Sequence, residues 1–170
     1  MYQKGDHIVY GTKGPCKVQD ITYLDMSGCD EERQYYVLVP LDTKASTIYS
    51  PVDNQKVLMR SVISREEAEE LVEKIYEMDV IKITNEKLRE EDYKNVLRDC
   101  EPENYLRLMK TLMVRKEKRL AEGKKFTSVD ERYLAEVTQK ICLELALVLE
   151  KTVDEMQTEI KEKIAEGIQI

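Results

Sequence analysis

Within the first eighteen residues, glycines interrupt a stretch of alternating apolar residues, and this pattern limits the folds that the chain can adopt. Within Lys4–Val18, Gly11 and Gly14 lie close together, after a short segment in which Ile8 and Tyr10 alternate with other side chains. Glycine reaches backbone angles that other residues adopt only at a cost, so it favours tight turns. The stretch therefore predicts a turn, a short strand, a tight bend and a second strand, which is the opening of a small, strongly bent β-barrel.

Five short strands are predicted in the first sixty residues. They are expected at Ile8–Tyr10, Cys16–Tyr23, Gln34–Leu41, Thr47–Ser50 and Lys56–Met59. Alternating apolar positions and a high content of Tyr and Val are typical of strands. A single helical or 3₁₀ turn is expected at Pro51–Asn54. Five short strands joined by tight turns predict a small barrel over residues 1–60.

The pattern changes to helical spacing at Ser64. Ser64 and Glu67 have the spacing of a capping box, in which each side chain bonds to a backbone amide near the start of a helix. A second helix is expected over Asn85–Cys100. Pro102 suits the first position of a third helix, and Gly123 is placed to end it.

A fourth helix is predicted to begin at Ser128, which forms a second capping-box pattern with Glu131. Its apolar spacing continues through Val153 to Ile164, so we expect one very long helix that frays after about Thr152. The fold class is therefore α+β, with a β-module at 1–60 and an all-helical domain at 61–170.

Composition excludes several classes of function. The net charge is −7, and no apolar run has the length of a signal peptide or a membrane span, so a cytoplasmic protein without a membrane contact is expected. Cys16, Cys29, Cys100 and Cys142 lack zinc-ligand spacing, and His7 is the only histidine. We expect reduced cysteines, no metal and no cofactor. No nucleophile motif, phosphate loop or dinucleotide fingerprint occurs, so an enzyme with a small-molecule substrate is not expected.

Charge is distributed unevenly along the helical domain. Residues 105–126 carry a local charge of +6, whereas 61–104 carry −7 and 127–170 carry −5. A basic helix end inside an acidic chain suits a focused contact with phosphate. Pairing of these lysines and arginines with their acidic neighbours is the alternative, and the sequence leaves both open.

Several motifs together resemble one family. The patterns are Lys4-Gly5-Asp6-x-Ile8-Val9-Tyr10-x-x-x-Gly14, then Gln34–Leu38, then Thr47–Asn54, and in the second half Asn85…Arg89…Tyr93-Lys94 and Ser128-x-x-Glu131-Arg132-x-x-Leu134. They are similar to the CarD/CdnL family of bacterial transcription regulators. Its N-terminal Tudor-like RNA-polymerase-interaction domain also occurs in transcription-repair coupling factors.

The resemblance implies a Tudor/SH3-like five-stranded barrel that binds the β-subunit lobe of RNA polymerase, largely by strand pairing. An exposed strand edge offers unpaired N–H and C=O groups for such pairing. The residues expected at this contact are Thr47, Ile48, Tyr49, Ser50 and Leu24. Tyr49 stands where some family members carry an arginine.

The resemblance also implies that the helical domain contacts promoter DNA just upstream of the melted region and modulates the stability of the open complex. The residues expected to contact DNA are Leu88, Arg89, Arg115, Lys116, Arg119, Lys124, Lys125 and Arg132. Family members typically insert a Trp into the minor groove. This chain has no Trp, and Leu88, followed by the acidic run Glu90–Asp92, stands in the matching region.

An alternative keeps the polymerase contact and drops the DNA contact. In that reading the chain is a protein-interaction adaptor whose helical domain recruits a protein partner. A steep salt dependence of promoter binding separates the two, because only the DNA-binding protein releases counterions from phosphates.

Overall fold

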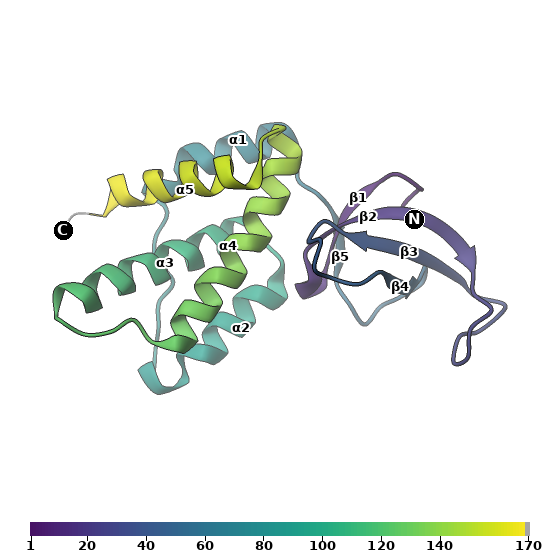
Figure 1. The fold of residues 1–170 in the computed structure, drawn as a ribbon, viewed down its shortest axis with the longest axis horizontal. Coiled ribbons are helices and arrows are strands. Elements are labelled where there is room, and N and C mark those ends of the chain that lie inside the picture. The colour runs from purple at the N-terminus through teal and green to yellow at the C-terminus, as the bar shows by residue number, and fades with distance from the viewer. Residues whose placement is uncertain (169–170) are drawn as a thin grey trace. The chain divides into compact units, whose positions relative to one another are not determined.

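The computed structural model describes residues 1–168 of the chain. The chain forms two compact units, Met1–Val62 and Ile63–Ile170, shown in purple to blue and in blue-green to yellow in Figure 1.

The first unit is a five-stranded antiparallel sheet. Its strands are β1 (His7–Tyr10), β2 (Pro15–Tyr23), β3 (Gln34–Pro40), β4 (Ile48–Pro51) and β5 (Met59–Ser61). The strand order is β4-β3-β2-β1-β5, so β4 and β5 are the two edges. The structure confirms the predicted fold class, a Tudor-like sheet followed by helices.

A small apolar core holds this sheet together. Ile8, Cys16, Val18, Tyr36 and Leu38 are buried, and each comes from β1, β2 or β3. Successive side chains of a strand point to opposite faces, so the alternation seen in the sequence places one set of apolar residues inside. The register of β2 against β3 shifts between Val18 and Asp20, a bulge that bends the sheet.

One local prediction in this unit was wrong, and another was confirmed. The fifth strand lies at Met59–Ser61 and not at Lys56–Met59, because it pairs with β1 through Ile8 opposite Ser61 and Tyr10 opposite Met59. The single turn predicted at Pro51–Asn54 is present, because the Asn54 amide donates to the Pro51 carbonyl, three residues earlier, at 3.0 Å, and Pro51 itself is the last residue of β4.

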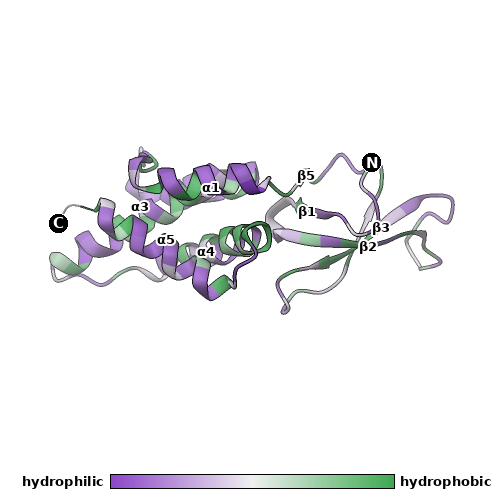
Figure 2. Cartoon of the chain, turned by 90° about the horizontal axis from the view of Figure 1, so that it is seen from above, coloured by the Kyte–Doolittle hydropathy of each residue, from purple (hydrophilic) through white to green (hydrophobic). Residues whose placement is uncertain are grey.

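The second unit contains five α-helices. They are α1 (Arg65–Lys74), α2 (Arg89–Asp99), α3 (Pro102–Ala121), α4 (Ser128–Leu149) and α5 (Val153–Gly167), with 3₁₀ turns at Ile75–Glu77, Glu86–Leu88 and, in the first unit, Gly11–Lys13. Polar and apolar residues alternate along these helices in Figure 2. Their apolar faces meet in one core that includes Tyr93, Leu108, Leu112, Ile141 and Leu145.

The helix starts were predicted with mixed success. The capping box of Ser64 and Glu67 is present at α1, and Pro102 is the first residue of α3, both as predicted. Helix α4 begins at Ser128, as predicted, but the capping box predicted for Ser128 and Glu131 was wrong. Thr127 is its N-cap and accepts from the Asp130 amide, so Ser128 is already inside the helix.

The long fourth helix is in fact two helices. Helix α4 ends at Leu149, Glu150 takes a left-handed backbone conformation with φ of 54°, and Thr152 caps the start of α5. Helix α5 packs on α4 and on the 3₁₀ turn after α1. Its residues Met156 and Ile160 are fully buried, so the tail completes the core and the expectation of fraying after Thr152 was wrong.

The 3₁₀ turn at Ile75–Glu77 and the connection that follows it are held against α3 by polar side chains. The Lys110 ammonium donates to the carbonyls of Ile75, Tyr76 and Met78 at 3.1, 2.9 and 2.7 Å, and the Thr111 hydroxyl accepts from the Ile81 amide at 2.8 Å. Carbonyls at the end of a helix commonly lack backbone donors, although the Ile75 carbonyl also accepts from the Met78 amide at 3.2 Å. Lys110 is buried, which is rare for lysine unless its charge is compensated in this way.

No helix within residues 1–168 combines the length and the apolar character that a membrane span requires.

Candidate polymerase edge and basic helix end

The free edge of β4 presents backbone groups that β3 does not use. The Val52 amide donates to the Gln34 carbonyl at 3.0 Å, and Tyr49 lies opposite Val37 in the same register. Along an antiparallel strand, residues whose N–H and C=O point toward the partner alternate with residues whose groups point away. Counting back from Val52, the N–H and C=O of Tyr49 point away from β3, toward the open edge.

The side chains of β4 divide between the core and the surface. Ser50 is fully buried and Ile48 packs on the core, whereas the Tyr49 ring is 46 % exposed. Among residues 1–168 no backbone group bonds to the N–H or the C=O of Tyr49, so the edge offers a tyrosine ring beside an open donor and an open acceptor. Leu24, predicted at the same surface, is buried, so its side chain does not extend the exposed edge.

The opposite edge of the sheet is less open. Strand β5 has three residues, and the Arg60 guanidinium donates to the Ser61 carbonyl at 3.1 Å. By the same alternation, with the Val62 amide bonded to the His7 carbonyl, that Ser61 carbonyl points outward. Its outward acceptor is already occupied, which leaves β4 as the better template for an added strand.

A buried carboxylate organises the start of α4 in the helical unit. Asp130 is fully buried and accepts from Arg89 Nε at 3.0 Å and from the Tyr93 hydroxyl at 2.8 Å. Arg115 lies 3.5 Å from its other oxygen and also forms a bidentate pair with Glu86, with both distances 3.0 Å. Arg89 and Arg115 are about one-fifth exposed.

The partners of Asp130 determine its protonation. Burial by itself raises the pKa of Asp130, but the hydrogen bonds from Tyr93 and Arg89 and the charge of Arg115 outweigh burial and hold the pKa below its usual value. The hydrogen bond from Arg115 likewise lowers the pKa of Glu86. Burial, with the nearby Asp130 carboxylate, raises the pKa of the Tyr93 hydroxyl, which stays a neutral donor.

Two residues that were predicted to contact DNA, Arg89 and Arg115, form contacts within this network. Arg89 also donates to the Thr127 hydroxyl at 3.2 Å and to the Glu86 carbonyl at 3.0 Å, so its donors face inward. Arg115 is committed to Glu86 and Asp130. A phosphate would have to compete with these carboxylates for either guanidinium.

The other predicted basic residues remain at the surface, to different degrees. Arg132 pairs with Glu90 at 2.8 Å, and Lys124 pairs with Glu122 at 3.3 Å. Arg119 Nε donates to the Lys125 carbonyl at 2.7 Å, which ties the end of α3 to the turn that follows. Lys116 lies 5.7 Å from the centre of the Phe126 ring.

Four cations of this helix end form no ion pair among residues 1–168. They are Lys116, Lys118, Arg119 and Lys125. We call them, together with Lys124, the basic turn. Leu88 is 60 % exposed and is the last residue of the 3₁₀ turn at Glu86–Leu88. Glu86, at the start of that turn, borders a shallow hollow with Arg115 and Arg119. Leu88 therefore lies near the basic turn, because Glu86 of the same 3₁₀ turn borders Arg119. Arg132, on α4, forms an ion pair with Glu90.

Comparison with known families gives an identification for the first unit. Residues 2–63 match the family model of the CarD-like/TRCF RID domain. The RID is an RNA polymerase-interacting domain, and members of its family interact with the β subunit of the polymerase. No curated protein matches the chain.

The match confirms the predicted domain type of the first unit. It ends at the first residue of the helical unit and fits both CarD-like regulators and coupling factors, so the resemblance of the whole chain to CarD/CdnL stays a prediction. Within residues 1–168 no group of three or more His, Cys, Asp or Glu side chains is arranged to hold a metal ion.

Sequence reasoning missed the residues at the centre of the helical unit. Asp130 was counted only as one acidic residue among many, and Lys110 only as one charge of the basic stretch. Lys110 had a readable signal, since it sits between the apolar positions Leu106, Met109 and Leu112 of α3. Asp130 had none, because its partners on α2 and α3 are far away in the sequence.

Proposed function

We propose that this chain is a non-enzymatic, CarD-like transcription regulator. Its RID binds the RNA polymerase β-subunit lobe by adding the β4 edge to a strand of the polymerase. Its helical unit contacts promoter DNA upstream of the melted region and modulates the stability of the open complex. The observation that carries the proposal is the open β4 edge, with the exposed Tyr49 ring, inside a domain of the polymerase-interacting family.

Strand addition gives affinity through backbone hydrogen bonds and selectivity through alternate side chains. Tyr49 supplies both the outward backbone N–H and C=O and an exposed side chain at one position. Tyrosine is among the residues that contribute most to protein interfaces when buried there. Thr47 precedes β4 and is exposed, so it extends the same edge.

A pair of variants separates the backbone from the ring. Tyr49→Ala removes the ring and keeps the outward N–H, and we expect it to weaken binding to the isolated β lobe about 5- to 30-fold. Tyr49→Pro removes both, and we expect a loss of more than about 100-fold. Proline is tolerated on an edge strand where its missing N–H faces solvent, so the sheet should survive.

Binding is measured by biolayer interferometry on the full chain, with hydrogen exchange of β1 and β2 amides as the control for folding. A folded Tyr49→Pro variant with wild-type affinity would show that the polymerase uses another surface.

The DNA contact rests on the basic turn. Gly123 has a positive φ of 72° and reverses the chain after α3, which brings Lys124 and Lys125 back beside Arg119. Contacts of this kind reach phosphates and position a protein without reading the base sequence. Leu88, exposed nearby, is a candidate apolar wedge for the minor groove.

The test is the salt dependence of the complex with polymerase and promoter. Lys124→Glu/Lys125→Glu should weaken the complex and reduce the log–log salt slope by roughly one unit for each lost phosphate contact. Lys82→Glu/Lys161→Glu, the same charge change at two exposed lysines outside the basic turn, should leave the slope unchanged.

If both pairs of variants behave alike while the β lobe is still bound, the adaptor alternative takes the place of the DNA contact. One observation favours that alternative: Arg89 and Arg115 are engaged within the helical unit.

A further inference from the structure

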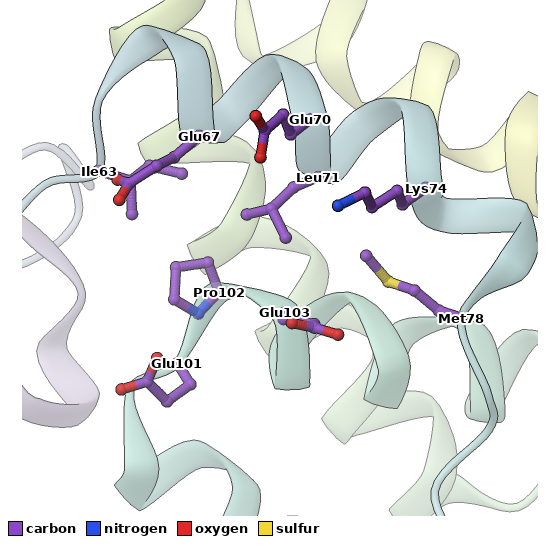
Figure 3. A pocket seen from close by; sticks show the side chains of 9 residues that line it. All are labelled: Ile63, Glu67, Glu70, Leu71, Lys74, Met78, Glu101, Pro102 and Glu103. Atoms are coloured by element: carbon purple, nitrogen blue, oxygen red, sulfur yellow. The ribbon is translucent and has the colours of Figure 1, made fainter.

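A second surface of the helical unit has the opposite character from the basic turn. It is a hollow of about 300 Å³ between α1 and the start of α3. We call it the acidic groove, and it is lined by Ile63, Glu67, Glu70, Leu71, Lys74, Met78, Glu101, Pro102 and Glu103. In Figure 3, Leu71 and Pro102 face each other across the groove, with Met78 toward one end.

The floor of the groove is apolar. Pro102 and Met78 are buried, and Ile63 and Leu71 are half-buried residues that pack against the core of the helical unit. Their remaining surface is open to solvent inside the groove. Covering apolar surface is favourable at about 25 cal/mol for each Å² removed from water, so the floor suits an apolar side chain of a partner.

The rim of the groove is strongly acidic. Four glutamates face one lysine, and among residues 1–168 neither Lys74 nor Glu70, Glu101 or Glu103 forms an ion pair. Glu67 has a structural role, because its carboxylate accepts from the Ser64 amide at 2.9 Å. With one lysine among four glutamates, the rim keeps a net negative charge around an apolar floor.

An apolar floor inside an acidic rim favours a basic protein segment over other classes of partner. Negative charge repels nucleic acid and anionic small molecules. The carboxylates are spread along the rim and do not converge on one point, so they do not form a metal site. A protein segment with one apolar residue between lysines or arginines satisfies the floor and the rim together, because cations on a desolvated rim pair with carboxylates and steer the encounter.

We propose that the acidic groove binds a basic segment of a second protein through one apolar anchor residue flanked by lysine or arginine. A hollow of this size lies at the lower end of ligand pockets, which suits one or two side chains and not a whole helix. The inference does not depend on the polymerase contact, which belongs to the RID.

The probe is a fluorescein-labelled peptide of twelve residues with a central Leu flanked on each side by Arg and Lys. Fluorescence anisotropy with the full chain gives its affinity, and shifts in a ¹⁵N-correlation spectrum locate it. We expect shifts at α1 and the start of α3. Exchanging the central Leu for Ser in the peptide should lower the affinity at least fivefold.

Two pairs of variants distinguish binding in the acidic groove from attraction of the peptide to the net negative charge of the chain. Glu70→Gln/Glu103→Gln should weaken peptide binding about tenfold, as expected for two lost ion pairs at a partly desolvated rim. Glu73→Gln/Glu166→Gln changes the net charge equally at exposed positions outside the groove, and it should change the affinity less than twofold. Neither pair touches the β4 edge, so polymerase binding should be unaffected.

Three outcomes would overturn the proposal. Equal losses in both pairs would mean that the peptide senses only net charge. Spectral shifts away from α1 and α3 would place it elsewhere. Concentration-dependent dimerisation that Glu70→Gln/Glu103→Gln abolishes would assign the groove to the basic turn of a second copy of this chain.

Discussion

Removing the charge of Asp130 tests whether the buried network is a structural centre of the helical unit. Asp130→Asn keeps the shape of the side chain and one acceptor oxygen. It removes the charge that faces Arg89 at 3.0 Å and Arg115 at 3.5 Å. Leaving a buried cation without its counter-ion typically costs about 3–5 kcal/mol. Because both arginines are about one-fifth exposed, solvent screens part of this cost, and we expect a loss of about 2–4 kcal/mol.

The loss can be measured by urea unfolding followed at 222 nm. All five α-helices lie in the second unit, so this signal reports the helical unit. With a slope of about 2 kcal/mol per molar urea, the midpoint should fall by about 1–2 M. Glu131→Gln is the matched control. It makes the same charge change at the exposed neighbouring residue, and its effect should stay within about 0.5 kcal/mol.

The pH dependence gives an independent check on the same residue. The folded pKa of Asp130 lies below its unfolded value, so its contribution is present above about pH 4 and disappears as the pH falls through the folded pKa. Wild type should therefore lose more stability than Asp130→Asn between about pH 4 and pH 2. A loss under about 1 kcal/mol at pH 7, or parallel pH curves for the two proteins, would refute the reasoning.

Three further predictions follow from single contacts. Lys110→Met removes the donor for three carbonyls and should cost the helical unit about 2–4 kcal/mol in the same urea assay. Thr127→Ala removes the N-cap of α4 and should cost about 1–2 kcal/mol, whereas Ser128→Ala should cost less than about 0.5 kcal/mol; the opposite order would contradict the assignment of the cap. Burial raises the pKa of the Cys142 thiol to about 12, so in Ellman titration at pH 8 the partly exposed Cys29 should react first, and Cys142 only after unfolding.

Local signals predicted the parts of the fold that depend on neighbours in the sequence. The capping box at Ser64 and the proline at Pro102 act within one helical turn, and both were identified. The position of β5 depends on pairing with β1, about fifty residues earlier in the chain. Nothing in the local composition of Lys56–Met59 reveals that partner, and the predicted strand began three residues too early and ended two residues too early.

The break between α4 and α5 had a local signal that hydrophobic spacing concealed. Thr152 accepts from the Glu155 amide at 3.1 Å, as an N-cap does. The apolar positions Leu149, Val153 and Met156 nevertheless keep the spacing of three or four residues that is typical of one continuous helix. Spacing alone does not distinguish a long helix from two helices whose apolar faces meet the same core.

The candidate functional sites show the same limit, which is that local sequence does not reveal contacts between residues far apart in the chain. Counting charges located the basic stretch, but it could not reveal which charges have partners. Arg115 and Lys110 both belong to that stretch, and both are turned inward by groups that lie far away in the sequence. Lys124, Lys125 and Arg119 are the part of the stretch for which local sequence was a sufficient guide, because the turn at Gly123 is itself local.

The two ends of α3 have opposite electrostatic roles. The helix begins at Pro102, in the acidic groove, and ends at Ala121, beside the basic turn. Twenty residues with a rise of about 1.5 Å each separate the two surfaces by roughly 30 Å. That distance is several Debye lengths at physiological salt, so a phosphate at one end does not sense the carboxylates at the other. An acidic helical unit can therefore carry a local cationic surface, and a nucleic acid and a basic protein segment could be bound at the same time without competing.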